Sequence, residues 1–193
     1  MVDKHFNTYK EGLDLEFVWQ YCQKHGTVRT LERGEALEEI GQPAQWVAYV
    51  EQGCFKYIVH NASEGKDYCT GFAFAGEFVA NFPYCLTGEI SELTIEADTP
   101  SKVRVISGQE VQALFDSSEE MARKNIHILG NLFKMVYDRY LDLYRYTPRE
   151  RYEQLVSRCP KVVHQLSLKD IASFLNITPT YLSKIRRELT FSE

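Results

Sequence analysis

Between Val28 and Ser107 the apolar residues fall in short runs with partial alternation, and glycines separate the runs. Because the runs are rich in β-branched and aromatic residues, they are predicted to be strands. The clearest strands are residues 46–52, 54–60, 67–74, 93–97 and 102–107. Short strands at regular spacing, with no long helices between them, indicate an antiparallel barrel or sandwich rather than a doubly wound parallel sheet.

Helical periodicity replaces this alternation after Ser107, where Ser107 and Glu110 fit the capping box of a short helix. A long helix is predicted over residues 118–146, because its apolar residues recur in steps of four and three, the spacing of a coiled-coil seam. The seam residues are Ala122, Ile126, Leu129, Phe133, Val136, Tyr140 and Leu143.

Such a long helix favours dimerisation. About 28 residues at 1.5 Å each span roughly 40 Å, which is more than a small domain can cover. We therefore expect the seam to join two copies of the chain. A helix buried within one chain would show a similar pattern and is the alternative.

The remaining residues, 147–193, contain three helix starts. Thr147 is a suitable N-cap, followed by Pro148 at the first helical position and Glu150 at the third, and Pro160 should end that helix. Ser167 caps a second helix with Ile171, Ala172 and Leu175 inward, and Thr178-Pro179 begins a third with Leu182, Ile185 and Leu189 inward. Between them, Asn176 suits a left-handed turn. This arrangement is typical of a helix-turn-helix.

If the last helix enters the major groove of DNA, its outward residues Thr180, Tyr181 and Lys184 face the base edges. Basic and hydroxyl side chains beside them can reach phosphates. The predicted DNA-binding residues are Ser167, Thr178, Thr180, Tyr181, Ser183, Lys184, Arg186 and Arg187. The alternative is a capped helical hairpin with no nucleic-acid role.

The charge is unevenly distributed along the chain. The net charge is −5, yet residues 147–193 hold eight basic and five acidic residues, hence +3, which leaves −8 for the rest. No apolar run approaches the roughly 18 residues of a membrane span, and we see no secretory signal, so the cytoplasm is the expected compartment. The five scattered cysteines predict buried reduced thiols, and no catalytic residue, metal site or cofactor is expected.

Three stretches of the chain resemble the superfamily of the cyclic-AMP receptor protein and the fumarate–nitrate reduction regulator (Crp/Fnr): residues 31–59, residues 76–97, and residues 151–160 followed by 166–189. The last, with its helix-turn-helix, is the most specific. The resemblance implies an α+β fold: a cyclic-nucleotide-binding-like β jelly roll at residues 1–117, a dimerisation helix at 118–146 and a helix-turn-helix at 147–193. Many relatives carry a β-hairpin wing after this point, which we expect to be absent or truncated here.

The second stretch occupies the place of the cassette that binds the cyclic phosphate in the family. Relatives that bind cyclic nucleotides carry an arginine there, because a buried phosphate requires a cation. No Arg or Lys occurs between Lys66 and Lys102, so we expect no binding of cyclic AMP in the family manner. Binding of a cyclic nucleotide in an atypical mode is the alternative. The candidate effector-pocket residues are Phe78, Asn81, Phe82, Ser91, Glu92 and Leu93.

The predicted function is a homodimeric transcription regulator that binds double-stranded DNA. RNA polymerase and a small-molecule effector, uncharged or cationic, are candidate further partners, and no membrane is expected. The alternative function is an effector-binding module that acts through protein–protein contacts. An enzyme on a β-helix barrel is the least favoured reading, because the strands supply no H-x-D or H-x-H pair for a metal.

Overall fold

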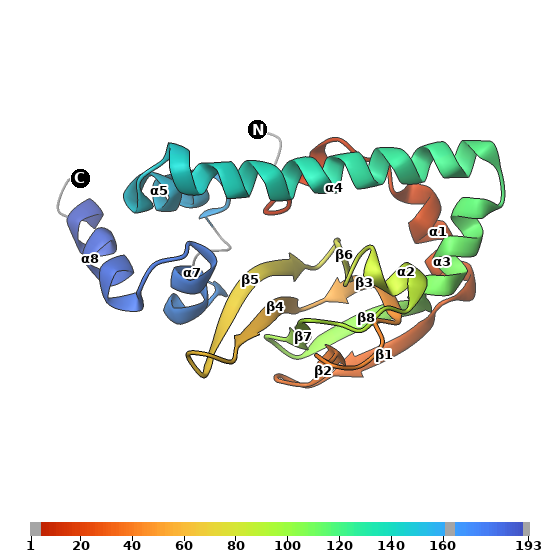
Figure 1. Cartoon of the computed structure of the whole chain (residues 1–193), viewed down its shortest axis with the longest axis horizontal. Helices are drawn as coiled ribbons and strands as arrows, with labels where there is room; N and C mark the ends of the chain where they lie inside the picture. The colour runs from red at the N-terminus through yellow and green to blue at the C-terminus, as the bar shows by residue number, and fades with distance from the viewer. Residues whose placement is uncertain (1–4, 161–164, 191–193) are drawn as a thin grey trace. The chain divides into compact units, whose positions relative to one another are not determined.

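A computed structural model describes residues 5–160 and 165–190 (Figure 1). The chain divides into two compact units: a strand unit, Leu13–Ile128, and a helical unit that combines the residues up to Gly12 with those from Leu129 onward. Strands and helices are segregated along the chain, which confirms the expected α+β class. Lys161 and Glu193, two charges of the predicted basic segment, lie outside the described residues.

The strand unit contains two four-stranded antiparallel sheets that form the expected jelly roll. The first sheet has the order β1 (Thr27–Leu31), β8 (Ser101–Ser107), β3 (Trp46–Gln52) and β6 (Phe78–Ala80). The second has the order β2 (Ala36–Glu38), β7 (Thr94–Ala97), β4 (Cys54–Asn61) and β5 (Lys66–Phe74). All five clearest predicted strands are confirmed within one residue at each end.

The core lies between the sheets and draws on both. Val50 and Val103 come from the first sheet and Phe55 and Ile95 from the second, and all four are fully buried. Burial of each such side chain stabilises the fold by about 1.5–3 kcal/mol. At the β3–β4 turn, Gly53 has φ +91°, and a Cβ there would lie 2.1 Å from the Ser101 hydroxyl, so this tight connection between sheets requires glycine.

Three helices belong to the strand unit: α1 (Glu16–His25), α2 (Tyr84–Thr87) and α3 (Gly108–Asp116). The capping box of α3 is confirmed, since Ser107 Oγ accepts from the Glu110 N–H and the Glu110 carboxylate accepts from the Ser107 N–H at 2.9 Å. The sequence reasoning did not identify α1. Its Val18 and Cys22 are buried, but two buried positions do not make a clear helical period.

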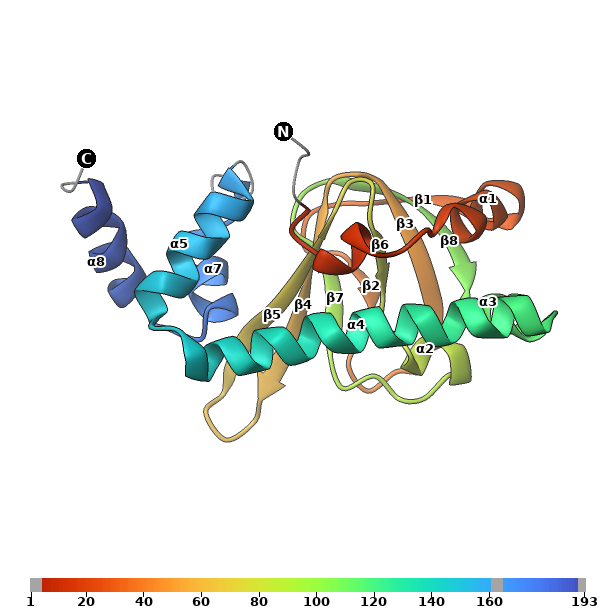
Figure 2. The same ribbon diagram turned by 90° about the horizontal axis from the view of Figure 1, so that it is seen from above.

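The long helix α4 (Glu119–Arg145) has nearly the predicted bounds and crosses the boundary between the two units at residue 128. It ends before α5 (Pro148–Arg158), whose capping box pairs Thr147 with Glu150 as predicted. Two more described helices follow, α7 (Leu168–Phe174) and α8 (Pro179–Thr190), and Figure 2 shows both beside α5. No helix of the described residues combines the length and hydropathy that a membrane span requires.

One boundary differs from the expected domain division. Residues 5–12, which include the short 3-10 helix η1 (Thr8–Glu11), belong to the helical unit and not to the sensor domain in which residues 1–117 were placed. The physical reason is that Phe6 and Tyr9 are buried there. Because the segment is mostly polar, its sequence did not indicate that these two aromatic residues are buried.

Candidate nucleic-acid interface

A network of local hydrogen bonds builds the α7–α8 pair. The Ser167 hydroxyl oxygen accepts from the Asp170 N–H at 3.0 Å and caps α7. After α7, Asn176 takes the left-handed φ of 53°, as predicted, and its N–H donates to the Ser173 carbonyl at 2.9 Å. The Thr178 hydroxyl then accepts from the Tyr181 N–H at 3.2 Å and caps α8. The turn between the helices is therefore fixed by the sequence 176–178.

The inward faces of both helices are buried as the apolar spacing predicts, except that Leu189 near the end of α8 is only partly buried. Ile171 and Ala172 of α7 and Leu182 and Ile185 of α8 are at most 2% exposed. A residue larger than Ala172 would hold the helices apart, because packed interiors leave little free space. Since these positions are filled, the opposite face of α8 is presented outward.

That outward face carries most of the predicted DNA-binding set. Seven of the eight predicted residues are exposed: Ser167 before α7 and, at the start of α8 or on it, Thr178, Thr180, Tyr181, Ser183, Lys184 and Arg187. The Lys184 ammonium lies 3.9 Å from Glu188, and its side chain remains 59% exposed. The face thus offers hydroxyls, a phenol and two cations to solvent.

Arg186 is placed differently from the others. Its guanidinium carbon lies 5.5 Å from the centroid of the Tyr152 ring on α5, and the residue is partly buried. A cation over an aromatic face stabilises packing. Arg186 therefore helps to hold α8 on α5, a role that helical periodicity alone does not reveal.

The seam of α4 forms an exposed apolar stripe. All its predicted residues, from Ala122 to Leu143, are exposed, and Ile126 and Phe133 reach 69%. Four aromatic rings continue the stripe, since Phe133, Tyr137, Tyr140 and Tyr144 contact one another in sequence at centroid distances of 5.3–6.3 Å. Exposed apolar patches of this kind mark interaction surfaces.

The candidate effector-pocket residues only partly come together. The Asn81 amide donates to the Ser91 hydroxyl at 2.8 Å, and Ser91 donates in turn to the Leu93 carbonyl at 2.7 Å. Asn81 and Ser91 are buried, whereas Glu92 is exposed and Phe78 packs edge-on against Tyr49 at 5.3 Å. Phe82 is partly buried. The two buried polar side chains, Asn81 and Ser91, therefore hydrogen-bond to each other.

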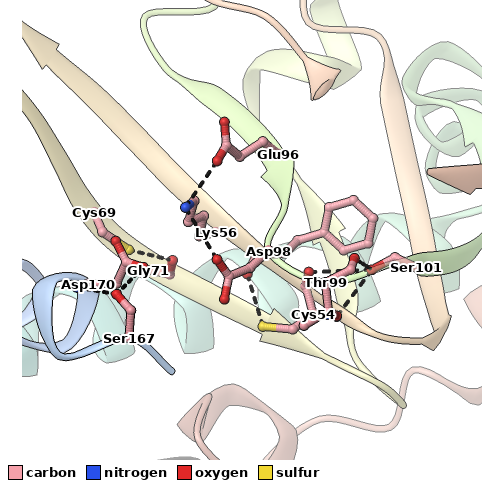
Figure 3. Close-up of polar contacts among 11 residues, drawn as sticks. Cys54, Lys56, Cys69, Gly71, Glu96, Asp98, Thr99, Ser101, Ser167 and Asp170 are labelled. Atoms are coloured by element: carbon pink, nitrogen blue, oxygen red, sulfur yellow. Dashed lines mark hydrogen bonds and ion pairs between the residues drawn. The ribbon is translucent and has the colours of Figure 1, made fainter. Parts of the chain in front are cut away.

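Two charged residues of the strand unit, Lys56 and Glu38, form ion pairs or hydrogen bonds with other groups of the protein. Lys56 on β4 lies between Glu96, at 3.0 Å, and the buried Asp98, at 3.3 Å (Figure 3). Glu38 is buried and accepts the Gln45 and Trp46 N–H groups at 2.8 and 2.6 Å. Burial raises the pKa of Glu38 despite these hydrogen bonds.

All five cysteines are free and buried, as predicted. Burial raises the pKa of the Cys22 and Cys85 thiols to about 12 and also raises that of Cys54. These three therefore remain protonated and unreactive at neutral pH. Among the described residues, no three His, Cys, Asp or Glu side chains are grouped closely enough to hold a metal ion.

Two arginines were missed by the sequence reasoning. Arg139 of α4 contacts the ring of Phe174, and Arg151 of α5 donates to the Leu175 carbonyl, so both hold the end of α7. The spacing of these arginines could not have indicated their contacts with the end of α7, because Phe174 and Leu175 are distant from them in sequence.

Comparison with known proteins agrees with this architecture. The family model of the cyclic nucleotide-binding domain matches residues 28–118. A search of curated proteins gave no match. The solved structure of FixK2 from Bradyrhizobium japonicum is similar with a TM-score of 0.74 and 19% identity, over 86% of this chain and 85% of that one.

Two further solved structures are similar at lower scores. CLP from Xanthomonas campestris, described as a c-di-GMP responsive global regulator, has a TM-score of 0.65 and 15% identity, with 93% of each chain covered. A protein of Eubacterium rectale described as a Crp/Fnr-family transcriptional regulator has a TM-score of 0.65 and 12% identity, over 90% of this chain and 82% of that one. Residues 28–118 therefore resemble a cyclic nucleotide-binding domain, and the chain has the fold of these solved structures, as its sequence motifs led us to expect.

Proposed function

We propose that this chain is a cytoplasmic transcription regulator that binds double-stranded DNA as a homodimer through α8. The observation that carries the proposal is the division of α8 into two faces. Leu182 and Ile185 fix the helix to its own unit, while Thr180, Tyr181 and Lys184 face solvent. A helix presented in this way, after a tight turn and a capped partner helix, suits the major groove.

Because the whole chain is acidic, the basic residues on the exposed face of α8 are important for the proposed binding of DNA. At a net charge of −5 the protein does not attract nucleic acid everywhere, so binding depends on a local basic surface. Lys184 and Arg187 supply it on α8, with the Thr178 hydroxyl as a donor to phosphate. The Ser167 hydroxyl donates to the Asp170 carboxylate at 2.6 Å and would have to turn away from it to reach a phosphate. Thr180, Tyr181 and Ser183 are the candidates for reading base edges.

Dimerisation through the α4 seam would present two copies of α8. Two recognition helices on a two-fold axis read half-sites about 34 Å apart, so the preferred site should be nearly palindromic. The exposure of Phe133 and Val136 supports this role, because a second copy would remove them from water.

For the sensor we propose an effector that is uncharged or cationic, or none. CLP responds to c-di-GMP, an anion, but here residues 67–101 hold no cation, and the nearby Lys56 is already paired with Glu96 and Asp98. Asn81 and Ser91 hydrogen-bond to each other instead of remaining available to a ligand. Cyclic AMP would therefore meet no matching charge. RNA polymerase is a candidate further partner, and we propose no enzymatic activity.

The test is selection of duplexes from a random library by the full chain, followed by fluorescence anisotropy at two salt concentrations. We expect a preferred, nearly palindromic sequence and an affinity that falls as salt rises. The double variant Lys184→Glu, Arg187→Glu should lose this binding. The matched control is Lys24→Glu, Arg33→Glu, which makes the same charge change at exposed positions of the strand unit.

A second candidate function is an effector-binding module whose α8 contacts another protein. The same experiment separates the two. Failure of the wild-type chain to select any sequence, at low as well as moderate salt, would favour the protein-binding module. Equal DNA binding by the α8 variant and its control would instead show that the DNA-binding surface lies outside α8.

A further inference from the structure

Three side chains from distant parts of the sequence meet in the helical unit. The guanidinium carbon of Arg139 on α4 lies 5.3 Å from the ring centroid of Phe6 and 5.1 Å from that of Phe174, the last residue of α7. The two rings are 5.1 Å apart at an angle of 47°. Each pair of this triangle is therefore in contact, and each side chain comes from a different segment.

The rest of the N-terminal segment is tied to the same unit. The Asn7 side-chain oxygen accepts from Arg139 at 3.0 Å, and the His5 carbonyl accepts from Arg158 of α5 at 2.8 Å. The same arginine forms an ion pair with Glu11. Since Phe6, Asn7 and Tyr9 are buried, residues 5–12 contact α4, α5 and α7 as one ordered segment.

These contacts hold the end of α7 together with Arg151 of α5, which donates to the Leu175 carbonyl. A cation over an aromatic face and an aromatic pair each stabilise packing when they are partly desolvated. α7 has only seven residues and cannot remain helical or well placed by itself. Its position therefore depends on tertiary partners such as Phe6 and Arg139.

We propose that residues 5–12 form an N-terminal strap of the DNA-binding unit and that Arg139 is a positioning residue for α7, and hence for α8. The packing part of this inference stands on the contacts above, and its consequence for DNA rests on the proposed function. Only residues 13–15 separate the strap from α1 of the strand unit. The strap is thus a second covalent connection, besides α4, by which the two units are joined.

The experiment compares Phe6→Ala with Phe17→Ala in the full-length protein. Phe17 is a matched control, because it lies on α1 and packs against Phe115 within the strand unit. Amide hydrogen exchange of α7 should become about tenfold faster in Phe6→Ala and stay unchanged in Phe17→Ala, as expected for local loss of packing. DNA affinity at the selected site should fall in parallel for Phe6→Ala alone.

A milder pair of substitutions guards against loss of folding. Phe6→Leu, Arg139→Met and their combination form a double-mutant cycle on α7 exchange, and contacting residues should give non-additive effects. Additive effects, or equal acceleration in Phe6→Ala and Phe17→Ala, would overturn the strap. If α7 exchange responds as expected while the wild-type chain selects no DNA sequence, the strap stands and the proposed function fails.

Discussion

Arg151 joins the end of the long helix to the end of α7. One of its guanidinium nitrogens donates to the Tyr146 carbonyl, directly after α4, at 2.8 Å, and another donates to the Leu175 carbonyl, the C-cap of α7, at 3.0 Å. Carbonyls at helix C-termini lack partners within the helix and carry partial negative charge. A single cation on α5 therefore satisfies carbonyls at two helix ends, one after α4 and one at the end of α7.

Replacing this cation should loosen the helical unit. Arg151→Met removes both hydrogen bonds while keeping most of the apolar stem, and we expect a loss of about 1–2 kcal/mol in the free energy of unfolding. Denaturant unfolding followed by helical circular dichroism measures this. Arg149→Met is the control, because the half-exposed ion pairs of Arg149 with Glu153 and, at 3.8 Å, with Glu188 should each contribute about 0.5 kcal/mol or less. Equal losses in both variants would contradict a special role for Arg151.

These contacts show where sequence reasoning succeeds and where it stops. Capping boxes at Ser107 and Thr147 and the left-handed Asn176 are decided by residues within four positions, so local chemistry predicts them. The partners of Arg151 at residue 175 and of Arg139 at residue 6 depend on tertiary packing. No periodicity encodes them.

The same distinction explains the assignments on α8. The helical spacing of apolar residues correctly assigns Leu182 and Ile185 to the buried face of α8 and Thr180 and Lys184 to its exposed face. It cannot tell a solvated arginine from one that lies over a ring on a neighbouring helix, as Arg186 does over Tyr152. Residues 5–12 pose the same problem, since two buried aromatics in a polar segment have no recognisable pattern.

The turn before α8 should tolerate only a narrow choice of residues. Asn176 is exposed and has φ 53°, so substitution there changes the backbone preference and little else. Asn176→Gly should keep the free energy of unfolding within about 0.5 kcal/mol, whereas the β-branched Asn176→Val should lose about 1–2 kcal/mol, the cost of a left-handed backbone. Thermal unfolding distinguishes them, and a valine variant as stable as the glycine variant would exclude strain at this turn.

Buried Glu38 should make stability depend on pH. Burial raises the pKa of this carboxyl, so the folded chain retains its proton to higher pH than the unfolded chain. Its contribution to stability is then fully present below the ordinary carboxyl pKa and is lost as pH rises through the raised value. Glu38→Gln cannot ionise and therefore lacks this loss. Its free energy of unfolding, relative to that of the wild type, should rise across that pH range and then remain constant.

A second variant separates charge from hydrogen bonding at this position. Glu38→Ala leaves the Gln45 and Trp46 N–H groups without their acceptor and should cost about 1–3 kcal/mol at every pH. Denaturant unfolding between pH 4 and pH 8 measures all three proteins. A constant difference between Glu38→Gln and wild type would show that the carboxyl is not perturbed.

The exposed stripe of α4 leads to a prediction about assembly. In a two-fold dimer each substitution occurs twice, so a charge that would be buried on α4 acts at two places in one interface. Phe133→Glu should therefore raise the dimer dissociation constant by about 100-fold or more, since each uncompensated buried charge costs at least ~1.4 kcal/mol and each 1.4 kcal/mol is tenfold. Sedimentation velocity over a range of concentrations measures this change.

The adjacent residue supplies the matched control for that experiment. Lys134 is next to Phe133, its side chain is 75% exposed, and it pairs with Asp138 on its own helix. Lys134→Gln lies off the predicted seam and should leave the dissociation constant within about threefold, because exposed pairs contribute little. If Phe133→Glu and Lys134→Gln sediment alike as dimers, the interface lies elsewhere. If the wild-type chain is a monomer at every concentration, the paired presentation of α8 fails with it, because a single recognition helix cannot read two half-sites at once.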